Sequence, residues 1–489
     1  MFTILHLSDL HRSPADPISN AELLSSLAAD IDRHAGENPP GTSPDAIIVS
    51  GDVVQGVGLD TADSGALIAA QYAVATEFLD ALAGRYLNGD RCKLVIVPGN
   101  HDVDWNKARA ALAPAEEDEL PPRLASSTFS SSTDLRWSWP EQKAYRIADR
   151  GAYEDRLLAF RNFYSAFYDG TDRRLAQDLR SYFDLFELDD GRIAVAAFNS
   201  CAGNDCYCFA GHIPEDAIAN AHLTLRDHAA SAELLVAVWH HSIEGSPSSG
   251  DYMDLDAVNR MIGVGFRLGL HGHQHRAQLS HRYVLLPEEE RMAVVSAGSL
   301  CAGKRELPRG VNRQYNLIQL DEDLASARVH IREMAVATVF GPAMRAELGG
   351  KGYVDLKWDS EPFRRQAAHA VAFSRAAAVT AAEQAWKEGE ADEAKHILLA
   401  LTTALPSYER TLLARILEDE GDWEGLASRL GEPHDVNELT MLVRAHVQGG
   451  RYALAREALD RWSGALLLPS PQRGELEGFI NAREKMAAT

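Results

Sequence analysis

The sequence has little cysteine, fewer basic than acidic residues and no long hydrophobic run. Its 489 residues include five cysteines, which is too few for a fold stabilised by disulfides, and the odd number leaves at least one thiol unpaired. Lys and Arg total 48 against 71 Asp and Glu, so the net charge is −23. A chain this acidic repels polyanions at long range, so we expect no extended nucleic-acid binding surface, although nucleic-acid ends remain candidate substrates.

The apolar runs are short. The longest, such as residues 234–239, fall far below the roughly 20 residues that a membrane-spanning helix needs, so we expect no membrane partner. Residues 1–9 lack a basic start and reach Asp9 before any long apolar stretch, which is unlike a signal peptide. These features and the few cysteines predict a cytoplasmic protein. The content of 46 % hydrophobic and 24 % charged residues is typical of a globular chain, long enough here for two or three domains.

The first two thirds of the chain alternate short apolar runs with stretches of helical periodicity. This alternation predicts at least partly parallel sheets covered by helices. The expected strands are residues 2–7, 46–50, 93–97, 193–198, 234–239, 266–270, 292–296, 316–320 and 328–332, and the expected helices are 21–34, 66–86, 156–168 and 214–228. An insertion at about 105–150, with an acidic cluster, prolines and tryptophans, is expected to be either a functional lid or a poorly ordered segment.

The last third changes in character. Residues 341–360 are predicted to be a linker, after which the chain becomes rich in Ala, Leu and Glu. Three blocks repeat the order helix, turn and helix, with turn glycines at Gly389, Gly421 and Gly450, spaced 32 and 29 residues apart. Residues 361–489 therefore resemble a degenerate tetratricopeptide array, with a plain helical bundle as the alternative. Such arrays offer concave binding surfaces, so this region is a candidate site for a protein partner.

Five short polar motifs each follow directly on an expected strand. Ligands in α/β folds gather at the carboxyl ends of strands, so we expect these side chains to meet in one cleft. The motifs are Asp9-Leu10-His11, Gly51-Asp52, Gly99-Asn100-His101-Asp102, His240-His241 and Gly272-His273-Gln274-His275.

Carboxylates, imidazoles and an amide in one cleft are suited to a pair of divalent metal ions. Hydrolysis of a phosphate ester at neutral pH needs a strong nucleophile and neutralisation of the phosphoryl oxygens, and two ions about 3.5–4 Å apart supply both. Ions that close need a bridging carboxylate, for which Asp52 is the candidate. The mixture of nitrogen and oxygen donors suits Mn, Fe, Zn or Ni better than Ca, and we expect Mn.

The five motifs resemble those of the calcineurin-like metallophosphoesterase superfamily, over roughly residues 1–335. The resemblance implies an α/β fold, a four-layer αββα sandwich of two mixed sheets flanked by helices, here about residues 1–340. It also implies the metal ligands: Asp9, His11 and His275 for the first metal, Asn100, His240 and His273 for the second, and Asp52 as the bridge. His101 becomes the general acid or the stabiliser of transition-state charge, and Asp102 becomes the residue that orients it.

The fourth motif leaves two histidines to choose between. His240 is preferred because the family's ligand is the first residue after the strand, and because strand alternation turns His241 to the other side. The family often has Pro after this ligand, whereas this sequence has His241, so His241 is the alternative. Three cysteines nearby, Cys201, Cys206 and Cys208, are expected to be reduced thiols, with a structural zinc site as the alternative.

The expected function is that of a hydrolase of the phosphodiesterase or phosphatase type. The preferred substrate is a phosphodiester of nucleotide type, cleaved by in-line attack of a hydroxide that bridges two divalent metals. The alternatives are a nuclease that acts on DNA or RNA ends, and a phosphoprotein phosphatase recruited to a partner through residues 361–489.

Overall fold

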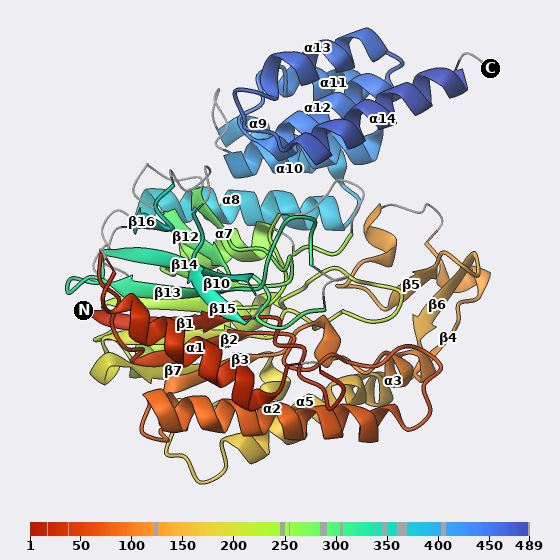
Figure 1. Ribbon diagram of the computed structural model, residues 1–489. Coiled ribbons are helices and arrows are strands. Elements are labelled where there is room, and N and C mark those ends of the chain that lie inside the picture. Colours follow the sequence, from red (N-terminus) through yellow and green to blue (C-terminus); the bar gives the residue numbers. More distant parts are fainter. Residues whose placement is uncertain are drawn as a thin grey trace. The chain divides into compact units, whose positions relative to one another are not determined.

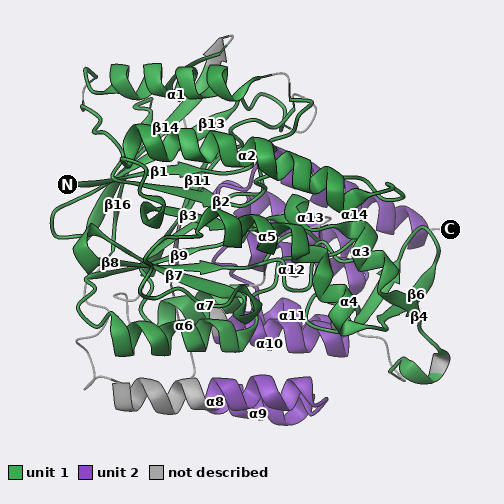
Figure 2. Cartoon of the chain, turned by 90° about the horizontal axis from the view of Figure 1, so that it is seen from below, with its two compact units in different colours: residues 1–245, 250–283, 288–364 green, residues 246–249, 284–287, 365–489 purple. Residues whose placement is uncertain are grey.

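The computed structural model describes most of the chain. The described residues are 1–16, 18–37, 39–121, 126–244, 250–253, 255–283, 291–303, 307–336, 338–344, 350–358, 369–401 and 407–487. Those up to residue 358 form one compact unit and those from residue 369 form a second, coloured green and purple in Figure 2.

The first sheet of the first unit begins with parallel strands that match the expected apolar runs. Strands β1 (Phe2–Leu7), β2 (Ala46–Ser50) and β3 (Leu94–Val97) pair side by side, and β2 and β3 are buried at every position. Antiparallel strands extend the other edge, in the order β15-β14-β13-β1-β2-β3, with β16 also paired to β14. These are β13 (Gln314–Leu320), β14 (Ser326–Val336), β15 (Val339–Pro342) and β16 (Tyr353–Lys357).

The second sheet has a parallel centre between two antiparallel edge strands. Its order is β11-β12-β10-β9-β8-β7. The strands are β7 (Phe183–Leu188), β8 (Ile193–Phe198), β9 (Leu234–Val238), β10 (Leu268–His271), β11 (Gln278–Tyr283) and β12 (Arg291–Ser296). The central strands are continuous apolar runs because parallel strands are covered on both faces.

Helices cover the outer faces of both sheets (Figures 1 and 2). Helices α1 (Asn20–His34) and α2 (Ser64–Tyr86) lie on the first sheet, and α6 (Glu215–His228) and α7 (Leu255–Gly263) lie on the second. Side chains from both sheets share one hydrophobic core, which includes Leu7 and Val49 from one sheet and Val236 from the other. The predicted α/β sandwich of two sheets flanked by helices is confirmed.

Local sequence explains where helix α1 begins. Ser19 and Glu22 form a reciprocal capping box at its first turn, which satisfies backbone N–H groups that lack helical partners. Leu23, Leu27 and Ile31 follow at four-residue spacing and face the core. The helix therefore starts at a cap and is held by one apolar face.

By length and composition alone, helix α2 could cross a membrane, although the short apolar runs of the sequence predicted no membrane-spanning helix. Its residues Ile68, Phe78 and Leu82 are fully buried in the core that both sheets share. Core helices of globular proteins have the same length and composition, so this helix alone is weak support for a membrane span.

In the part that the structure describes, the insertion contains a small sheet, and its role as a lid stays a prediction. Strands β4 (Leu112–Pro114), β5 (Leu135–Ser138) and β6 (Lys143–Ile147) pair in the order β4-β6-β5. Arg136 of β5 is buried and forms an ion pair with Asp205, and the Tyr153 hydroxyl also donates to Asp205. This buried charge pair fixes the insertion to the loop that follows β8.

The predicted linker at 341–360 needs correction. Within it, β15 ends at Pro342, and residues 353–357 form β16, which pairs antiparallel with β14 from Ser326↔Lys357 to His330↔Tyr353. Glycines and charged residues concealed this short edge strand, whose Val354 packs against the core. The predicted change of character near Phe363 lies outside the described residues.

The second unit is all helical, as predicted. Successive helices pack against each other, and Gly389, Gly421 and Gly450 occupy inter-helix turns with φ of 85°, 72° and 71°, which glycine adopts without strain. The tetratricopeptide geometry itself stays a prediction. The helices are α8 (His369–Lys387), α9 (Ala391–Leu401), α10 (Ser407–Glu420), α11 (Trp423–Arg429), α12 (Val436–Gln448), α13 (Tyr452–Trp462) and α14 (Ser470–Ala487).

Candidate metal centre

The backbone is strained at several of the motif residues. Asp9, His11, Asp52, His273 and His275 all have positive φ, between 45° and 77°. Non-glycine residues avoid this left-handed region, because it costs roughly 1–2 kcal/mol per residue. Strained residues of this kind concentrate at functional sites, where the surrounding fold holds them in place. Nine other non-glycine residues among those described also have positive φ, so this conformation agrees with the motifs and does not identify the site by itself.

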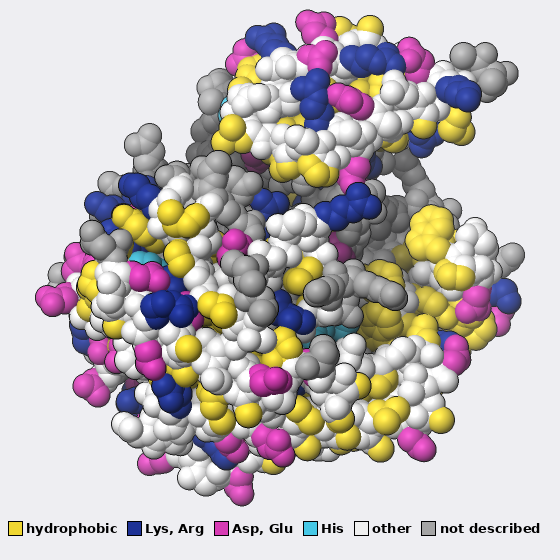
Figure 3. Space-filling view, in the orientation of Figure 1, with side chains coloured by type: hydrophobic (Ala, Val, Ile, Leu, Met, Phe, Trp, Pro, Cys, Tyr) yellow, Lys and Arg dark blue, Asp and Glu magenta, His cyan; other side chains and the backbone are white. Residues whose placement is uncertain are grey.

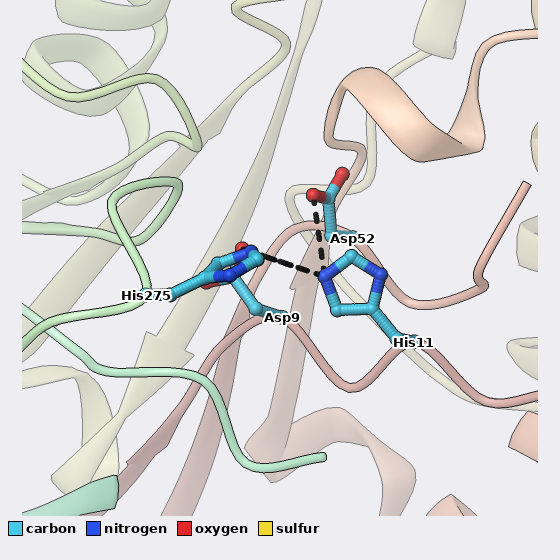
Figure 4. A group of neighbouring side chains, drawn as sticks. All are labelled: Asp9, His11, Asp52 and His275. Carbon is cyan, nitrogen blue, oxygen red and sulfur yellow. Dashed lines mark hydrogen bonds and ion pairs between the residues drawn. The ribbon is translucent and has the colours of Figure 1, made fainter. Parts of the chain in front are cut away.

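A first cluster consists of Asp9, His11, Asp52 and His275, whose ligand atoms all lie within 4.8 Å of one another. His11 Nε2 lies 3.2 Å from His275 Nε2 and 3.8 Å from Asp52 Oδ2, and His275 Nε2 lies 3.2 Å from Asp9 Oδ1. Figure 4 shows the four side chains pointing toward one another from three segments, with Asp9 and His11 on the same one. Among the described residues, this is the one group of three or more His, Cys, Asp or Glu side chains with such convergence.

A second cluster adjoins the first through Asp52. Asn100 Oδ1 lies 3.0 Å from His240 Nε2 and 3.0 Å from His273 Nδ1. His240 Nε2 also lies 3.4 Å from Asp52 Oδ2. The same carboxylate oxygen is thus near a histidine of each cluster, which is the position required of a bridging ligand.

The donor atoms fit divalent ions. Asp9 is fully buried, and its Oδ1 lies near the ring nitrogens of His275 and His11, at 3.2 and 3.9 Å, without a well-aligned hydrogen bond. Burial of a carboxylate is costly unless positive charge is close to it, and a bound cation would supply that charge. Burial opposes the charged form of His240, but the carboxylates of Asp52 and Asp9 outweigh it and raise the pKa of His240 to about 9. Buried negative charge in this cleft therefore attracts positive charge, and a bound metal would displace that proton.

The structure distinguishes the two adjacent histidines. The Nδ1–H of His240 donates to the Ser50 carbonyl at 2.8 Å, which turns Nε2 toward Asn100 and Asp52. His241 instead contacts Ser200 Oγ through Nδ1 at 2.9 Å. His240 therefore faces the cluster, whereas His241 lies behind it.

His101 stands at the edge of the cluster. Its ring centroid lies 4.6 Å from that of His11, and its backbone N–H donates to Asp52 Oδ1 at 2.8 Å. A carbonyl oxygen, that of Gln55, lies 2.6 Å from His101 Nδ1. Because a carbonyl only accepts, Nδ1 carries the proton and Nε2 is left to meet other groups.

The sequence predicted that Asp102 orients His101, but in the structure the Asp102 carboxylate binds other groups. The carboxylate is fully buried and accepts hydrogen bonds from the N–H groups of Gly99 and Val53 and from the hydroxyl of Tyr72. Burial, together with the charge on Asp52, raises the pKa of Asp102 to about 6. Asp102 thus secures the loop around Asn100, and the Gln55 carbonyl takes the orienting position.

Two motif glycines are required by close packing against the cluster. A Cβ on Gly99 would lie 2.2 Å from Asp52 Oδ1, and one on Gly272 would lie 1.7 Å from Ser8 Oγ. Real Cβ atoms essentially never approach so closely. These glycines let the loops after β3 and β10 reach the residues that follow β1 and β2.

Sequence reasoning missed several groups around the site. Gln55 acts through a backbone carbonyl, which no side-chain pattern reveals. Tyr72 is a core residue of helix α2, and Asn204, whose Nδ2 lies 3.3 Å from His241 Nε2, comes from a loop. Asp251 has its Oδ2 3.5 Å from His273 Nε2 and follows a Ser/Gly/Pro-rich stretch. For these residues, only proximity in the fold gives the signal.

The cysteines near the site are free thiols, as are the chain's other two. Burial raises the pKa of the Cys206 thiol to about 12, which keeps it protonated. In the part of the chain that the structure describes, Cys201, Cys206 and Cys208 form no group of converging metal-ligand atoms. The geometry gives the zinc alternative no support.

The model of the calcineurin-like phosphoesterase family matches residues 2–277, more than half of the chain. No protein with a curated description matches. Similar solved structures include a dimetal phosphatase from Danio rerio (10 % identity, TM-score 0.36, covering 73 % of this chain and 99 % of that one). Another is PhoD (11 % identity, TM-score 0.37, covering 73 % of this chain and 68 % of that one). A third is the calcineurin-like phosphoesterase YfkN from Bacillus subtilis (14 % identity, TM-score 0.28, covering 70 % of this chain and 88 % of that one). On the extent of the family match, the chain belongs to the calcineurin-like phosphoesterases.

Proposed function

We propose that this protein hydrolyses phosphodiesters of the nucleotide type at a centre for two divalent metal ions, with manganese as the preferred metal. The observation that carries the proposal is the convergence of imidazole nitrogens from both sheets on Asp52 Oδ2, at 3.8 Å for His11 and 3.4 Å for His240. The proposed ligands are Asp9, His11 and His275 for one ion, Asn100, His240 and His273 for the other, and Asp52 for both. When bound, such ions activate a water molecule and neutralise the phosphoryl oxygens.

His101 is the proposed proton donor. The Gln55 carbonyl holds the proton on Nδ1, so Nε2 is the atom that can meet a substrate oxygen. In its protonated form, Nε2–H can donate to the oxygen of the leaving group as the P–O bond breaks. In either form, the ring lies beside the cluster, 4.6 Å from the ring of His11.

Replacing His101 by Gln is expected to lower kcat by about 10²–10⁴-fold, the usual contribution of a general acid. The metal content should stay the same, because His101 is not a proposed ligand. The loss should be larger for a diester with an alkyl leaving group than for bis(p-nitrophenyl) phosphate, because p-nitrophenolate leaves without a proton. Steady-state kinetics with Mn²⁺ measure both.

His228→Gln is the matched control, since His228 is exposed at the end of helix α6. Equal losses on both leaving groups would contradict proton donation by His101, and an unchanged kcat would remove it from catalysis altogether.

An aromatic pair supports a nucleotide as the substrate. The rings of Trp105 and Phe209 lie 5.6 Å apart, and the Phe209 side chain is 47 % exposed. Trp105 opens the helix just after the Asn100 loop, and the Phe209 carbonyl accepts from Asn204, whose amide also contacts His241. Figure 3 shows histidines in a hollow with hydrophobic side chains beside it. Aromatic faces of this kind stack nucleobases, each worth about 1–3 kcal/mol.

Replacing Phe209 by Ala is expected to raise KM about tenfold for the p-nitrophenyl ester of thymidine 5′-monophosphate, in line with the loss of one stacking contact. Methyl p-nitrophenyl phosphate has the same leaving group and no base, so its KM should not change. Leu223→Ala, at another exposed apolar side chain, is the control. A KM that rises equally for both esters would contradict base stacking by Phe209.

The same full-length protein distinguishes the alternatives. Nucleotide diesters, single-stranded DNA with free ends and phosphopeptides are compared at equal Mn²⁺ concentration. Preference for DNA ends would favour the nuclease, and preference for phosphopeptides would favour a phosphatase guided by its helical unit. Purified, metal-loaded protein that is inert toward every ester would refute the proposed function.

A further inference from the structure

The two ring nitrogens of His273 have different surroundings. Nδ1 lies 3.0 Å from Asn100 Oδ1, the oxygen that His240 Nε2 also approaches. Nε2 is buried without a hydrogen-bond partner, and Oδ2 of Asp251 lies 3.5 Å from it. A carboxylate therefore stands on the side of the ring that faces away from Asn100.

The backbone around Asp251 is tied to the site. The N–H of Gly211 donates to the Tyr252 carbonyl at 3.2 Å, and the N–H of Met253 donates to the Ser242 carbonyl at 2.7 Å. Met253 is buried, and Ser242 lies two residues beyond His240. These contacts fix the position of Asp251, although its side chain is 38 % exposed.

His240 provides a precedent within the same site. Its Nδ1–H donates to the Ser50 carbonyl, which directs Nε2 toward Asn100 and Asp52. Histidines that bind metals commonly donate their second ring N–H to a carboxylate or a carbonyl, which fixes the tautomer and raises the basicity of the ligand nitrogen. His273 has the complementary arrangement, with a carboxylate in place of the carbonyl.

We propose that Asp251 is a positioning residue that accepts the Nε2–H of His273 and so holds Nδ1 toward the second metal site. This inference rests on the metal centre of the proposed function. The separation of 3.5 Å is that of an ion pair, about half an ångström beyond a hydrogen bond, so a small rotation of either side chain completes the contact. The effect of Asp251 is confined to one metal, because His273 is not a member of the first cluster.

The experiment titrates metal-free, full-length protein with Mn²⁺ by calorimetry, and with Co²⁺ by visible absorption. The wild type should bind two equivalents. Asp251→Ala should weaken one equivalent by about 10–100-fold, the usual loss when the partner of a ligand histidine is removed, and leave the other unchanged. Asp251→Glu, which restores a carboxylate, should recover part of the affinity and of the Co²⁺ spectrum. Asp227→Asn, at an exposed acid in helix α6, is the control for net charge.

A second variant separates positioning from a general loss of structure. In a His273→Ala background, Asp251→Ala should cause no further loss, because its effect passes through that ring. Two outcomes overturn the proposal: both equivalents keep their affinity in Asp251→Ala, or both weaken to the same extent. A wild type that binds fewer than two equivalents overturns this inference and the metal centre together. A wild type that binds two and hydrolyses no ester refutes only the proposed function.

Discussion

Asp52→Asn is expected to lower kcat for phosphodiester hydrolysis by about 10³-fold or more. Asp52 is the one carboxylate within 4 Å of a histidine of each cluster, among the described residues, so its negative charge serves both halves of the centre. Stabilisation of transition-state charge by such a centre is worth several kcal/mol, and about 4 kcal/mol corresponds to a thousandfold. Elemental analysis should also find less than two equivalents of bound metal.

The substitution should preserve the local structure, because Asn differs from Asp only in having an NH2 group in place of one carboxylate oxygen. Asn keeps an oxygen that can accept the backbone N–H of His101, which Asp52 Oδ1 accepts at 2.8 Å. Circular dichroism should therefore stay native. Asp60→Asn is the control, because Asp60 is an exposed acid whose ion-pair partner is Arg109. Wild-type turnover by Asp52→Asn with full metal occupancy would refute the assignment of Asp52 as the bridging ligand.

Arg332→Met is expected to lower the free energy of unfolding of the first unit by about 3–5 kcal/mol. The Arg332 guanidinium is buried and donates to both carboxylate oxygens of Asp30, at 2.8 Å each, and to both of Glu37, at 2.6 and 2.9 Å. It joins strand β14 to helix α1. Without it, the fully buried Asp30 keeps only the partly exposed Arg33 as a cationic partner and the Tyr315 hydroxyl as a donor. Urea unfolding followed by tryptophan fluorescence measures the loss.

Arg328→Met on the same strand is the control. Arg328 is also paired with a carboxylate, that of Asp355, but the pair is largely exposed, so its loss should cost less than about 1 kcal/mol. Similar losses in the two variants would show that the buried network of Arg332 contributes no more than a surface pair.

The difference in free energy of unfolding between the wild type and Arg332→Met should become smaller as the pH falls from 5 to 2. Hydrogen bonds from Arg332 lower the pKa of Glu37 to about 2, and for Asp30 they outweigh burial and lower its pKa as well. In this pH range the unfolded chain therefore binds more protons than the folded one. The stabilisation that these carboxylates give the folded state is fully present above their ordinary pKa values, 4.5 for Glu37 and 3.8 for Asp30. It is lost as the pH falls through their lower pKa values in the folded state. A constant difference over this range would contradict the assignment.

The parallel strands and the polar residues at their ends could be predicted because both signals are local. For example, the apolar run at residues 234–239 is followed directly by His240, so a few neighbouring positions are enough to predict both the strand and the polar residue at its end. Strand β7 was missed because Asp184 and Glu187 interrupt its apolar pattern. Asp184 is nevertheless buried, because Tyr164 and Arg173 donate hydrogen bonds to its carboxylate. These partners lie 20 and 11 residues away, so the residues next to Asp184 in the sequence do not indicate them.

The contacts that orient the site could not be predicted for a related reason. The sequence placed Asp102 beside His101 because the two are neighbours in the chain, but the fold turns the carboxylate toward Tyr72, 30 residues away. The acceptor for His101 is a main-chain carbonyl, which any residue type would supply. Residue identity therefore predicted which side chains gather, whereas the tertiary structure determines which atom of each is available.

The position of the centre has a consequence for the whole first unit. Asp9 and Asp52 follow strands of one sheet, whereas His240 and His275 follow strands of the other, so the cluster spans the seam between the two halves of the sandwich. Ions held there would join the halves by coordination bonds in addition to the apolar core. Resistance of this unit to heat would then rise with the free concentration of the metal, and chelators would act as denaturants as well as inhibitors.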